Sequence, residues 1–464
     1  MPLDASAPPV SLRDPGAILL VSCYELGHQP MGLAFPMAFL ERAGFRPDAL
    51  DLALEPLDAG RIRRSRLVAI SVPMHTALRI GVQAAAQVRA LNPAATICFH
   101  GLYAILNRHV LLGACADVIL GGEAEEPLVA LAEALERGQA PPPAPGPYVA
   151  RLRYPVPSRE RLAPLHRYAA FEREGERRVA GVVEASRGCL HGCRHCPIPP
   201  VYGGRFFVVP PDVVLEDIRR QVAAGARHVT FADPDFLNGP GHALRIAETL
   251  HAEFPALSFD FTAKVEHLLA HRALLPRLAA AGAAFVVTAA ESLSDAVLEK
   301  LDKGHTRADL ERALEAARSA GITVRPSWLP FTPWTSLDDY VELVEWLIGR
   351  DLVDCVEPVQ LAVRLLVPPG SALLAQPDIQ PYLRGLDAVA FTYRWEHPDE
   401  RMEGLCRAVT DLVHEANHAR EPAETTFRKV REAAYAAAGR RPEALATHAE
   451  RRPVAPRLTE PWFC

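Results

Sequence analysis

Short apolar runs of strand length alternate with segments of helical spacing along the N-terminal part of the chain. The helical segments place apolar residues every three or four positions, which is the pattern of an amphipathic helix packed on a core. Four strand-like runs lie at residues 17–24, 67–73, 95–101 and 117–123. The alternation predicts a parallel, doubly wound sheet, in which ligands bind beyond the carboxyl ends of the strands.

A second alternating series begins at residue 178 and continues to about residue 375. Its strands are expected at residues 178–186, 228–233, 257–263, 283–290, 322–330 and 358–368. Strands and helices that alternate in tandem in this way predict a partial (β/α)6 barrel, whose site lies at the carboxyl ends of its strands. From residue 376 onward the pattern becomes helical and ends in an irregular tail.

The two series are separated by a proline-rich stretch, which breaks helices and stiffens the chain. We therefore predict an α/β domain at residues 1–137, a linker at 138–177, a barrel at 178–375 and a helical region at 376–464. A chain of 464 residues with 49% hydrophobic residues is long enough for two or three such cores.

The charge and the hydropathy of the chain indicate which classes of partner it binds and in which compartment it is found. A net charge of −6 argues against general binding to nucleic acid, because the positive surface that attracts phosphates is missing. No apolar run reaches the length of a membrane helix, and the acidic, proline-broken N-terminus is unlike a signal peptide. We expect a cytoplasmic protein with reduced cysteines that does not bind a membrane.

Three of the nine cysteines form a cluster with the spacing Cys-x-x-x-Cys-x-x-Cys, at Cys189, Cys193 and Cys196. Clustered cysteines in a cytosolic chain are typical of a metal site. Three thiolates leave one iron of a cubane iron–sulfur cluster open for substrate. The alternative is a zinc site, in which His191 or His195 would have to supply the fourth ligand.

The triplet, placed directly after the first strand of a barrel-like series, resembles the radical S-adenosylmethionine (SAM) superfamily. The resemblance covers residues 178–370 and implies that the three cysteines hold a [4Fe–4S] cluster, whose open iron binds the amino and carboxylate groups of SAM. His195 stands where the family usually has an aromatic hydrocarbon side chain. The family resemblance also implies a flavodoxin- or ferredoxin-type reductant as partner.

The same resemblance implies SAM-binding roles for Asp233, Asp235 and Glu291, which follow the second and fourth strands of the series. Each position has an alternative interpretation. An Asp-Pro pair in a loop is as often a turn former, and Glu291 with Ser292 could simply begin a helix. Lys264, at the end of the third strand, is expected to be a solvated surface lysine.

The N-terminal series before a radical SAM barrel is similar to the cobalamin-binding class of this superfamily. The resemblance implies cofactor-binding turns at Gly101, Gly121 and Gly122, and it implies that cobalamin is a cofactor beside SAM and the cluster. The Asp-x-His-x-x-Gly signature, which places a histidine on cobalt, is absent. A degenerate domain that binds no cobalamin is the alternative.

The C-terminus, Thr459 to Cys464, resembles the start of the Cys-Sec-Ala-Glu-Pro or Cys-Cys-Ala-Glu-Pro tail of a radical SAM (seleno)protein subgroup. This resemblance implies a catalytic role for Cys464 and a selenoprotein truncated at that residue. An ordinary chain terminus that happens to end in cysteine is the alternative.

These patterns predict a radical SAM enzyme that transfers a methyl or alkyl group to an unreactive centre of a small molecule with the help of cobalamin. One alternative is transfer of the 3-amino-3-carboxypropyl group of SAM to a soft acceptor such as arsenic or sulfur. Another is a non-catalytic sensor or binding protein that carries the cluster. The sequence does not identify the substrate.

Overall fold

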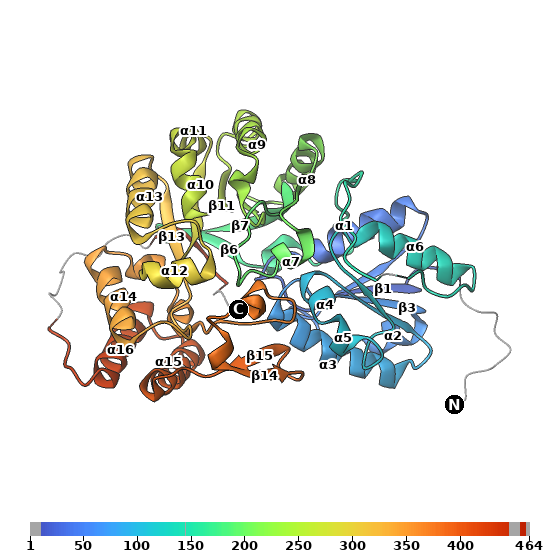
Figure 1. The fold of residues 1–464 in the computed structure, drawn as a ribbon. Coiled ribbons are helices and arrows are strands. Elements are labelled where there is room, and N and C mark those ends of the chain that lie inside the picture. Colours follow the sequence, from blue (N-terminus) through green and yellow to red (C-terminus); the bar gives the residue numbers. More distant parts are fainter. Residues whose placement is uncertain (1–10, 144, 445–454, 461–464) are drawn as a thin grey trace. The chain divides into compact units, whose positions relative to one another are not determined.

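The computed structural model describes residues 11–143, 145–444 and 455–460 (Figure 1). The chain divides into two compact units, one ending at Arg167 and the other beginning at Tyr168. The second unit thus begins inside the stretch expected to be a linker, because residues 170–173 form a strand of its sheet.

The first unit is built, within the described residues, on a five-stranded parallel sheet of order β2-β1-β3-β4-β5. Its strands are β1 (Ile18–Ser22), β2 (Asp48–Asp51), β3 (Leu67–Ser71), β4 (Thr96–His100) and β5 (Val118–Leu120). Its helices are α1 (Met31–Arg42), α2 (Ala59–Arg64), α3 (His75–Leu91), α4 (Leu102–Leu106), α5 (Arg108–Leu111) and α6 (Glu125–Glu136). The strands are added on one side of β1 with β2 and on its other side from β3 onward, so the strand order reverses between β1 and β3, which is where such sheets bind ligands.

Helices cover both faces of this sheet, which explains why its strands are continuous apolar runs rather than alternating ones. Leu20 and Leu67 pack in one core with residues of α1 and α6. Ile70 and Phe99 have the opposite phase and lie against Gly81 of α3, where a β-carbon would be only 3.2 Å from either side chain. The predicted doubly wound sheet is confirmed.

The second unit contains a curled sheet of order β13-β12-β11-β10-β7-β6-β16 (Figure 1). Its strands are β6 (Ala170–Arg173), β7 (Glu176–Val183), β10 (His228–Phe231), β11 (Ser258–Thr262), β12 (Ala283–Glu291), β13 (Thr323–Trp328) and β16 (Arg457–Leu458). The strands from β7 to β13 are parallel, whereas β6 and β16 close one edge in antiparallel fashion. A small hairpin of β8 (Ser186–Gly188) and β9 (Phe206–Val208) follows β7.

The helices of this part of the chain are α7 (Pro199–Tyr202), α8 (Pro211–Ala223), α9 (Pro240–Glu253), α10 (Val265–Ala270), α11 (Leu275–Ala280), α12 (Asp295–Leu301), α13 (Arg307–Ser319) and α14 (Leu337–Gly349). In Figure 1, helices α8, α9, α10, α11 and α13 lie along one side of the curled sheet. Short 3-10 helices in the chain are η1 (Leu165–Arg167), η2 (Phe236–Asn238), η3 (Arg272–Leu274), η4 (Val353–Cys355), η5 (Pro358–Ala362), η6 (Ala372–Ala375) and η7 (Gln380–Tyr382). The predicted partial barrel is confirmed as a fold class.

The sixth strand expected at residues 358–368 is reduced to one isolated bridge between Phe331 and Arg364. Pro358 begins η5 instead, and a proline cannot donate to a strand ladder. The side-chain oxygen of Gln360 accepts the hydrogen bond of the Trp328 amide at 3.1 Å, so a side chain takes the place of a strand carbonyl beside β13.

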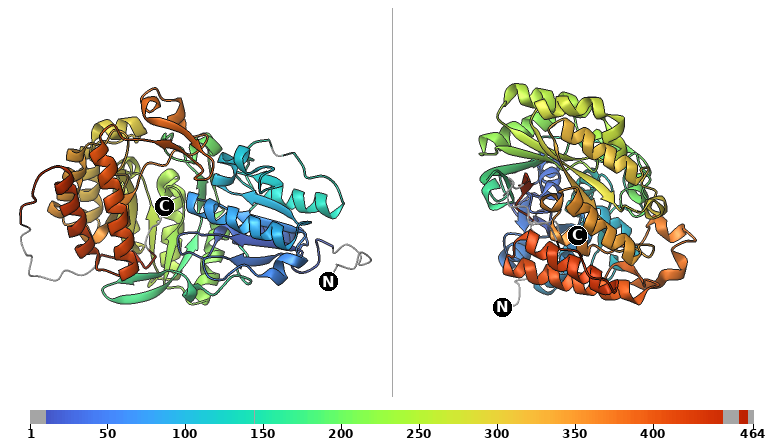
Figure 2. Two further views of the ribbon diagram at one scale, coloured as in Figure 1. Left: turned by 90° about the horizontal axis from the view of Figure 1, so that it is seen from below. Right: turned by 90° about the vertical axis from the view of Figure 1, so that its left-hand side faces the viewer.

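The C-terminal region is only partly helical, because it opens with the hairpin of β14 (Leu383–Asp387) and β15 (Thr392–Trp395). The Asp387 carboxylate accepts the amides of Val389 and Ala390 and so fixes the turn that joins the two strands. Helices α15 (Glu400–Ala419) and α16 (Ala423–Ala437) then run side by side (Figure 2). Cys464 lies outside the described residues. Among the helices that are described, none combines the length and apolar character that a membrane crossing requires.

Candidate functional site

The cysteine triplet lies in the loop that follows β8, at the carboxyl end of the curled sheet. The loop begins at Gly188, whose φ is +77°, and a β-carbon there would be 2.4 Å from the Arg205 carbonyl, so only glycine fits. Cys189 and Cys193 are buried and Cys196 is half-buried. This loop gathers three thiols in a mostly dry environment.

Burial and the neighbouring thiols both act on the pKa values of two thiols of this triplet. Burial, with smaller contributions from Cys193 and Cys189, raises the pKa of Cys196 to about 12, although the Ile198 amide and Lys303 lower it in part. Burial also raises the pKa of Cys189, which the charge of Cys193 increases in turn. Buried thiols of this kind ionise when a metal replaces their protons, because the metal supplies the missing positive charge.

Two buried polar atoms near the triplet have no hydrogen-bond partner among the described residues, and they bear on whether the site fits a cluster. The side-chain oxygen of Asn238 lies 3.9 Å from the Cys189 sulfur. The side-chain nitrogen of Asn238 has no hydrogen-bond partner among the described residues. The buried Nδ1 of His195, next to Cys196, also lacks one within that part of the chain. Three thiols with nearby unpaired polar atoms fit an iron–sulfur cluster and a polar ligand beside it.

Glu291 ends β12 and forms a buried ion pair that the sequence analysis did not foresee. Its carboxylate lies 3.1 Å from Lys303 Nζ and 3.2 Å from His195 Nε2. Burial alone raises the pKa of Glu291, but Lys303 and His195 outweigh burial and hold this pKa well below its usual range. Lys303 is only 3% exposed, and Cys193 and Cys196 add to the negative charge that it faces. This cation therefore links the cysteine triplet to Glu291.

Lys303 was missed because it lies in the turn after α12, where a lysine gives no motif. Its scarcity was the only available signal, since the chain has four lysines. Glu291 itself has a φ of +63°, which is uncommon for a residue with a side chain. Such backbone strain at the end of a barrel strand is typical of functional sites.

Asp233, predicted to bind SAM, is buried and holds the turn after β7. Its carboxylate accepts the Ala185 amide at 2.9 Å and the Ser186 hydroxyl. Burial raises the pKa of Asp233 to about 7, although both hydrogen bonds counteract the shift. The structure thus gives this side chain a local positioning role, and its contact with SAM stays a prediction.

Asp235 is fully buried and organises the loops after β10 and β11. One oxygen accepts the Leu237 amide at 2.9 Å, and the other accepts the Lys264 amide at 3.1 Å and lies 2.8 Å from His267 Nδ1. Lys264 was expected to be solvated but is 8% exposed, and it pairs with Glu266 at 3.3 Å. The expectation for Lys264 was wrong, because a carboxylate two residues along the chain stabilises its buried charge.

Neither histidine of the zinc alternative points to the triplet as a fourth ligand. The Nε2 atom of His195 pairs with Glu291, as described above. The Nε2 atom of His191 lies 3.0 Å from Nε2 of His267, and its Nδ1 lies 3.6 Å from Glu266. The geometry favours a site with three protein ligands.

In the first unit, the three predicted cofactor-binding glycines allow close packing between chain segments. A β-carbon would be 3.0 Å from the Val72 backbone at Gly101, 2.4 Å from the Ile105 side chain at Gly121, and 2.2 Å from the Tyr148 carbonyl at Gly122. Their binding roles stay predictions.

A buried polar atom that lacks a partner in the described part of the chain lies at the switch point of this sheet, where a ligand would be expected. The Ser22 hydroxyl, at the end of β1, is fully buried and has no hydrogen-bond partner among the described residues. An orphaned hydroxyl between β1 and β3 fits a ligand that reaches the carboxyl edge of the sheet.

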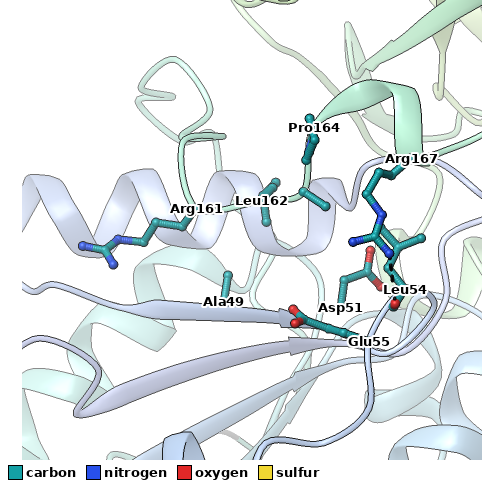
Figure 3. A pocket seen from close by; sticks show the side chains of 9 residues that line it. Ala49, Asp51, Leu54, Glu55, Arg161, Leu162, Pro164 and Arg167 are labelled. Carbon is teal, nitrogen blue, oxygen red and sulfur yellow. Dashed lines mark hydrogen bonds between the residues drawn. The ribbon is translucent and has the colours of Figure 1, made fainter.

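A separate pocket of about 220 Å³ lies at the carboxyl end of β2 in the first unit (Figure 3). Asp51, Glu55 and Arg167 give it polar walls, and Leu54 and Leu162 add apolar ones. In Figure 3 the Arg161 side chain points away from Asp51. The Arg167 guanidinium donates a hydrogen bond of 3.3 Å to the Leu54 carbonyl. One of the polar groups that line the pocket is thus already hydrogen-bonded to another lining residue.

Part of the chain matches a known protein family. Residues 183–347 match the model of the radical SAM superfamily. The match begins at the end of β7 and includes the cysteine loop, Asp235, Glu291 and Lys303.

Two relatives match part of the chain. The hopanoid C-3 methylase of Methylococcus capsulatus is 25% identical over 232 residues, which is 47% of this chain. A tRNA-2-methylthio-N(6)-dimethylallyladenosine synthase of Geobacter sulfurreducens is 29% identical over 197 residues, or 39% of this chain. The matched regions span 43% of the length of either relative.

Solved structures extend the similarity of fold to both units. The apo form of OxsB, a cobalamin-dependent SAM radical enzyme, has a TM-score of 0.68 at 15% identity and covers 90% of this chain and 71% of its own. The radical SAM methyltransferase TsrM from Kitasatospora setae, with cobalamin and a [4Fe–4S] cluster bound, has a TM-score of 0.58 at 17% identity and covers 72% and 70%. Residues 183–347 therefore form a radical SAM domain, whose cofactors are a [4Fe–4S] cluster and SAM.

Proposed function

We propose that this enzyme is cobalamin-dependent and transfers a methyl or alkyl group to an unreactive centre of a small molecule. The observation that supports it most is the combination of two sheets in one chain. A radical SAM barrel is preceded by a β2-β1-β3-β4-β5 sheet, and the same combination gives the fold similarity to OxsB over 90% of the chain.

The residues of the second unit have separate roles in this proposal. Cys189, Cys193 and Cys196 hold the cluster, which when reduced supplies the electron that cleaves SAM. Lys303 offsets the negative charge of the cluster loop and keeps the Glu291 carboxylate ionised, so that Glu291 can accept hydrogen bonds from SAM. Asp233 and Asp235 fix the loops between which SAM would lie.

The first unit would hold cobalamin, which supplies a carrier for the transferred group. Ser22 and the close-packed turns at Gly101 and Gly121 would form its edge of the site. Because the chain lacks the Asp-x-His-x-x-Gly signature, we infer that no histidine of such a motif binds cobalt and that the cofactor is held base-off.

The test is the set of products formed from SAM by the anaerobically reconstituted full chain, with dithionite as reductant and with or without cobalamin. The proposal predicts 5′-deoxyadenosine with reductant, and S-adenosylhomocysteine only when cobalamin is also present. Methylthioadenosine in their place would show 3-amino-3-carboxypropyl transfer. Intact SAM under every condition would favour a cluster-bearing sensor.

A second arm replaces dithionite with a flavodoxin or ferredoxin and its reductase. We expect the same products, because the cluster needs only a low-potential electron. Failure of this arm alone would remove the proposed protein reductant and leave the chemistry intact.

A further inference from the structure

A histidine of the cysteine loop and a histidine of a neighbouring helix face each other, each with its Nε2 atom toward the other ring. His191 lies between Cys189 and Cys193, and His267 lies on α10. Their Nε2 atoms are 3.0 Å apart. The two side chains are only 17% and 13% exposed, so little water reaches the space between the rings.

A carboxylate stands at the far nitrogen of each ring. His267 Nδ1 lies 2.8 Å from Asp235, and His191 Nδ1 lies 3.6 Å from Glu266. A carboxylate can only accept at these positions, so Asp235 favours the tautomer of His267 that carries its proton on Nδ1. The charge of Glu266 favours the same tautomer of His191, across a distance too long for a hydrogen bond. With both protons on Nδ1, the two Nε2 atoms present lone pairs to the same point, where a cation would stabilise them.

The surrounding charges also favour a cation. Asp235 and Glu266 contribute two negative charges, and Lys264, 3.3 Å from Glu266, contributes one positive charge. The backbone amides of Leu237 and Lys264 hold Asp235 in place, so its position does not depend on His267. The site therefore has a net negative charge and a fixed carboxylate before any ion binds.

We propose that His191 and His267 bind a divalent transition-metal ion, with Zn²⁺ as the best-suited ion, in addition to the cluster held by the cysteines. Neutral imidazole suits zinc, and a histidine that binds a metal usually donates its other nitrogen to a carboxylate. Two nitrogens about 2.05 Å from a tetrahedral ion lie about 3.3 Å apart, so the rings need to separate by only a few tenths of an ångström.

The remaining coordination positions are open, because Asp235 is already engaged as the hydrogen-bond partner of His267. The ligand atoms of His191, Asp235 and His267 all lie within 4.8 Å of one another. An ion with open positions next to the cysteine loop could take a water molecule or a thiolate, carboxylate or amine of a substrate. The proposal holds whether or not cobalamin is a cofactor.

The first test removes the competing thiols from the full chain. In the triple variant Cys189→Ser, Cys193→Ser, Cys196→Ser, circular dichroism checks the fold, and calorimetry measures Zn²⁺ binding. We expect one equivalent to bind. Co²⁺ in the same site should show visible d–d bands without a thiolate-to-cobalt charge-transfer band, because its protein ligands are nitrogens.

Matched variants separate the metal ligand from its hydrogen-bond partner. His267→Asn retains an amide donor near the position of Nδ1 but lacks Nε2, and we expect it to abolish Zn²⁺ binding. Glu266→Gln should weaken binding by about tenfold, as replacement of an outer partner does. His271→Ala is the control, because its ring lies 5.6 Å from that of His267 on the same segment.

The second test uses the reconstituted wild-type chain, so that it remains decisive if the triple variant does not fold. After a wash with chelator, we expect about four irons and one zinc in the wild type. His267→Asn should retain the irons and lose the zinc. Absence of zinc in the wild type, or equal zinc in His267→Asn, would overturn the proposal and indicate that a proton lies between the two rings.

Discussion

The carboxyl ends of the two sheets differ in the side chains that they present. At the end of the curled sheet, the loops bring together three thiols, the Glu291–Lys303 pair and the facing histidines. At the end of the first sheet, Gly101, Gly121 and Gly122 let segments of chain approach more closely than a β-carbon would allow. In both units the parallel strands end at a common edge of the sheet. Reactive side chains occupy this edge in the second unit, whereas closely packed backbone occupies it in the first.

Buried cysteines show the same contrast. Burial, with smaller contributions from the charges of Asp51 and Glu25, raises the pKa of Cys23 in the first unit to about 12. Burial raises the pKa of Cys196 equally, but there Lys303 lowers it in part. The charged groups that shift the pKa of Cys23 are both negative, so among the described residues no cation favours its thiolate. The charges around a buried thiol, and not burial alone, distinguish Cys196 from Cys23.

The largest expected effect concerns these cysteines. Replacing Cys189, Cys193 or Cys196 by Ala should each reduce the iron content of the reconstituted chain from about four to nearly zero, because three thiolates are the minimum that holds the cluster. Iron analysis and the visible absorbance of the cluster measure the loss.

The matched control is Cys98→Ala, which removes a fully buried thiol of the first unit. This variant should retain all the iron, and its free energy of unfolding should decrease only as much as the removal of one small buried side chain requires. Loss of the cluster in Cys98→Ala, with retention in Cys196→Ala, would reverse the ligand assignment and with it the contrast between the units.

The next effect concerns the ion pair that distinguishes the second unit. Lys303→Met leaves the Glu291 charge buried without its main partner and should lower the free energy of unfolding by about 3–5 kcal/mol. Adding Glu291→Gln should restore part of this loss, because it removes the uncompensated charge. Chemical denaturation of the iron-free chain, followed by fluorescence, measures both variants.

The pair also sets a pH dependence. Glu291 has a pKa below its ordinary value of 4.5, so its contribution to stability is complete above that pH and falls as the pH decreases below it. The wild type should lose stability faster than Glu291→Gln in this acidic range. Equal slopes would show that Lys303 and Glu291 do not interact as the geometry requires.

The fold was predictable where the apolar pattern is continuous, as in the parallel strands of both units. The fixed spacing of the three cysteines predicted a common loop at the end of the sheet, whereas their role as cluster ligands stays a prediction. The strand expected at residues 358–368 was wrong because a side chain, Gln360, supplies a hydrogen bond that the apolar pattern assigns to a strand. Lys303 and His267 reach the site only through tertiary structure, because each lies far along the chain from the cysteines and belongs to no local motif.

A smaller effect tests the close packing of the first unit. Gly122 has a φ of +73°, and a β-carbon there would be 2.2 Å from the Tyr148 carbonyl. Gly122→Ala should destabilise the chain by about 1–3 kcal/mol through strain and overlap. Gly113→Ala is matched to it, because Gly113 has a φ of +79° but no atom within 4 Å.

The difference between the two glycine variants isolates the steric part of the effect, since both share the backbone strain. Thermal unfolding of the full chain measures it. If the two variants were equally stable, the turn at Gly122 would move easily, and the first unit would not depend on close packing at this edge.

The smallest effect concerns Ser22, the one residue at the switch point of the first sheet whose buried hydroxyl lacks a partner in the described chain. An unsatisfied hydroxyl in a core costs free energy, so Ser22→Ala should leave the cobalamin-free chain equally stable or more stable by about 1 kcal/mol. If the hydroxyl serves a ligand, the same variant should bind cobalamin more weakly, and stability and affinity should change in opposite directions. Absorbance spectra of the bound cofactor measure the affinity and should show the base-off form. Equal affinity in Ser22→Ala would show that the hydroxyl does not face cobalamin, whereas an imidazole-ligated spectrum would show that a histidine of this chain reaches the cobalt.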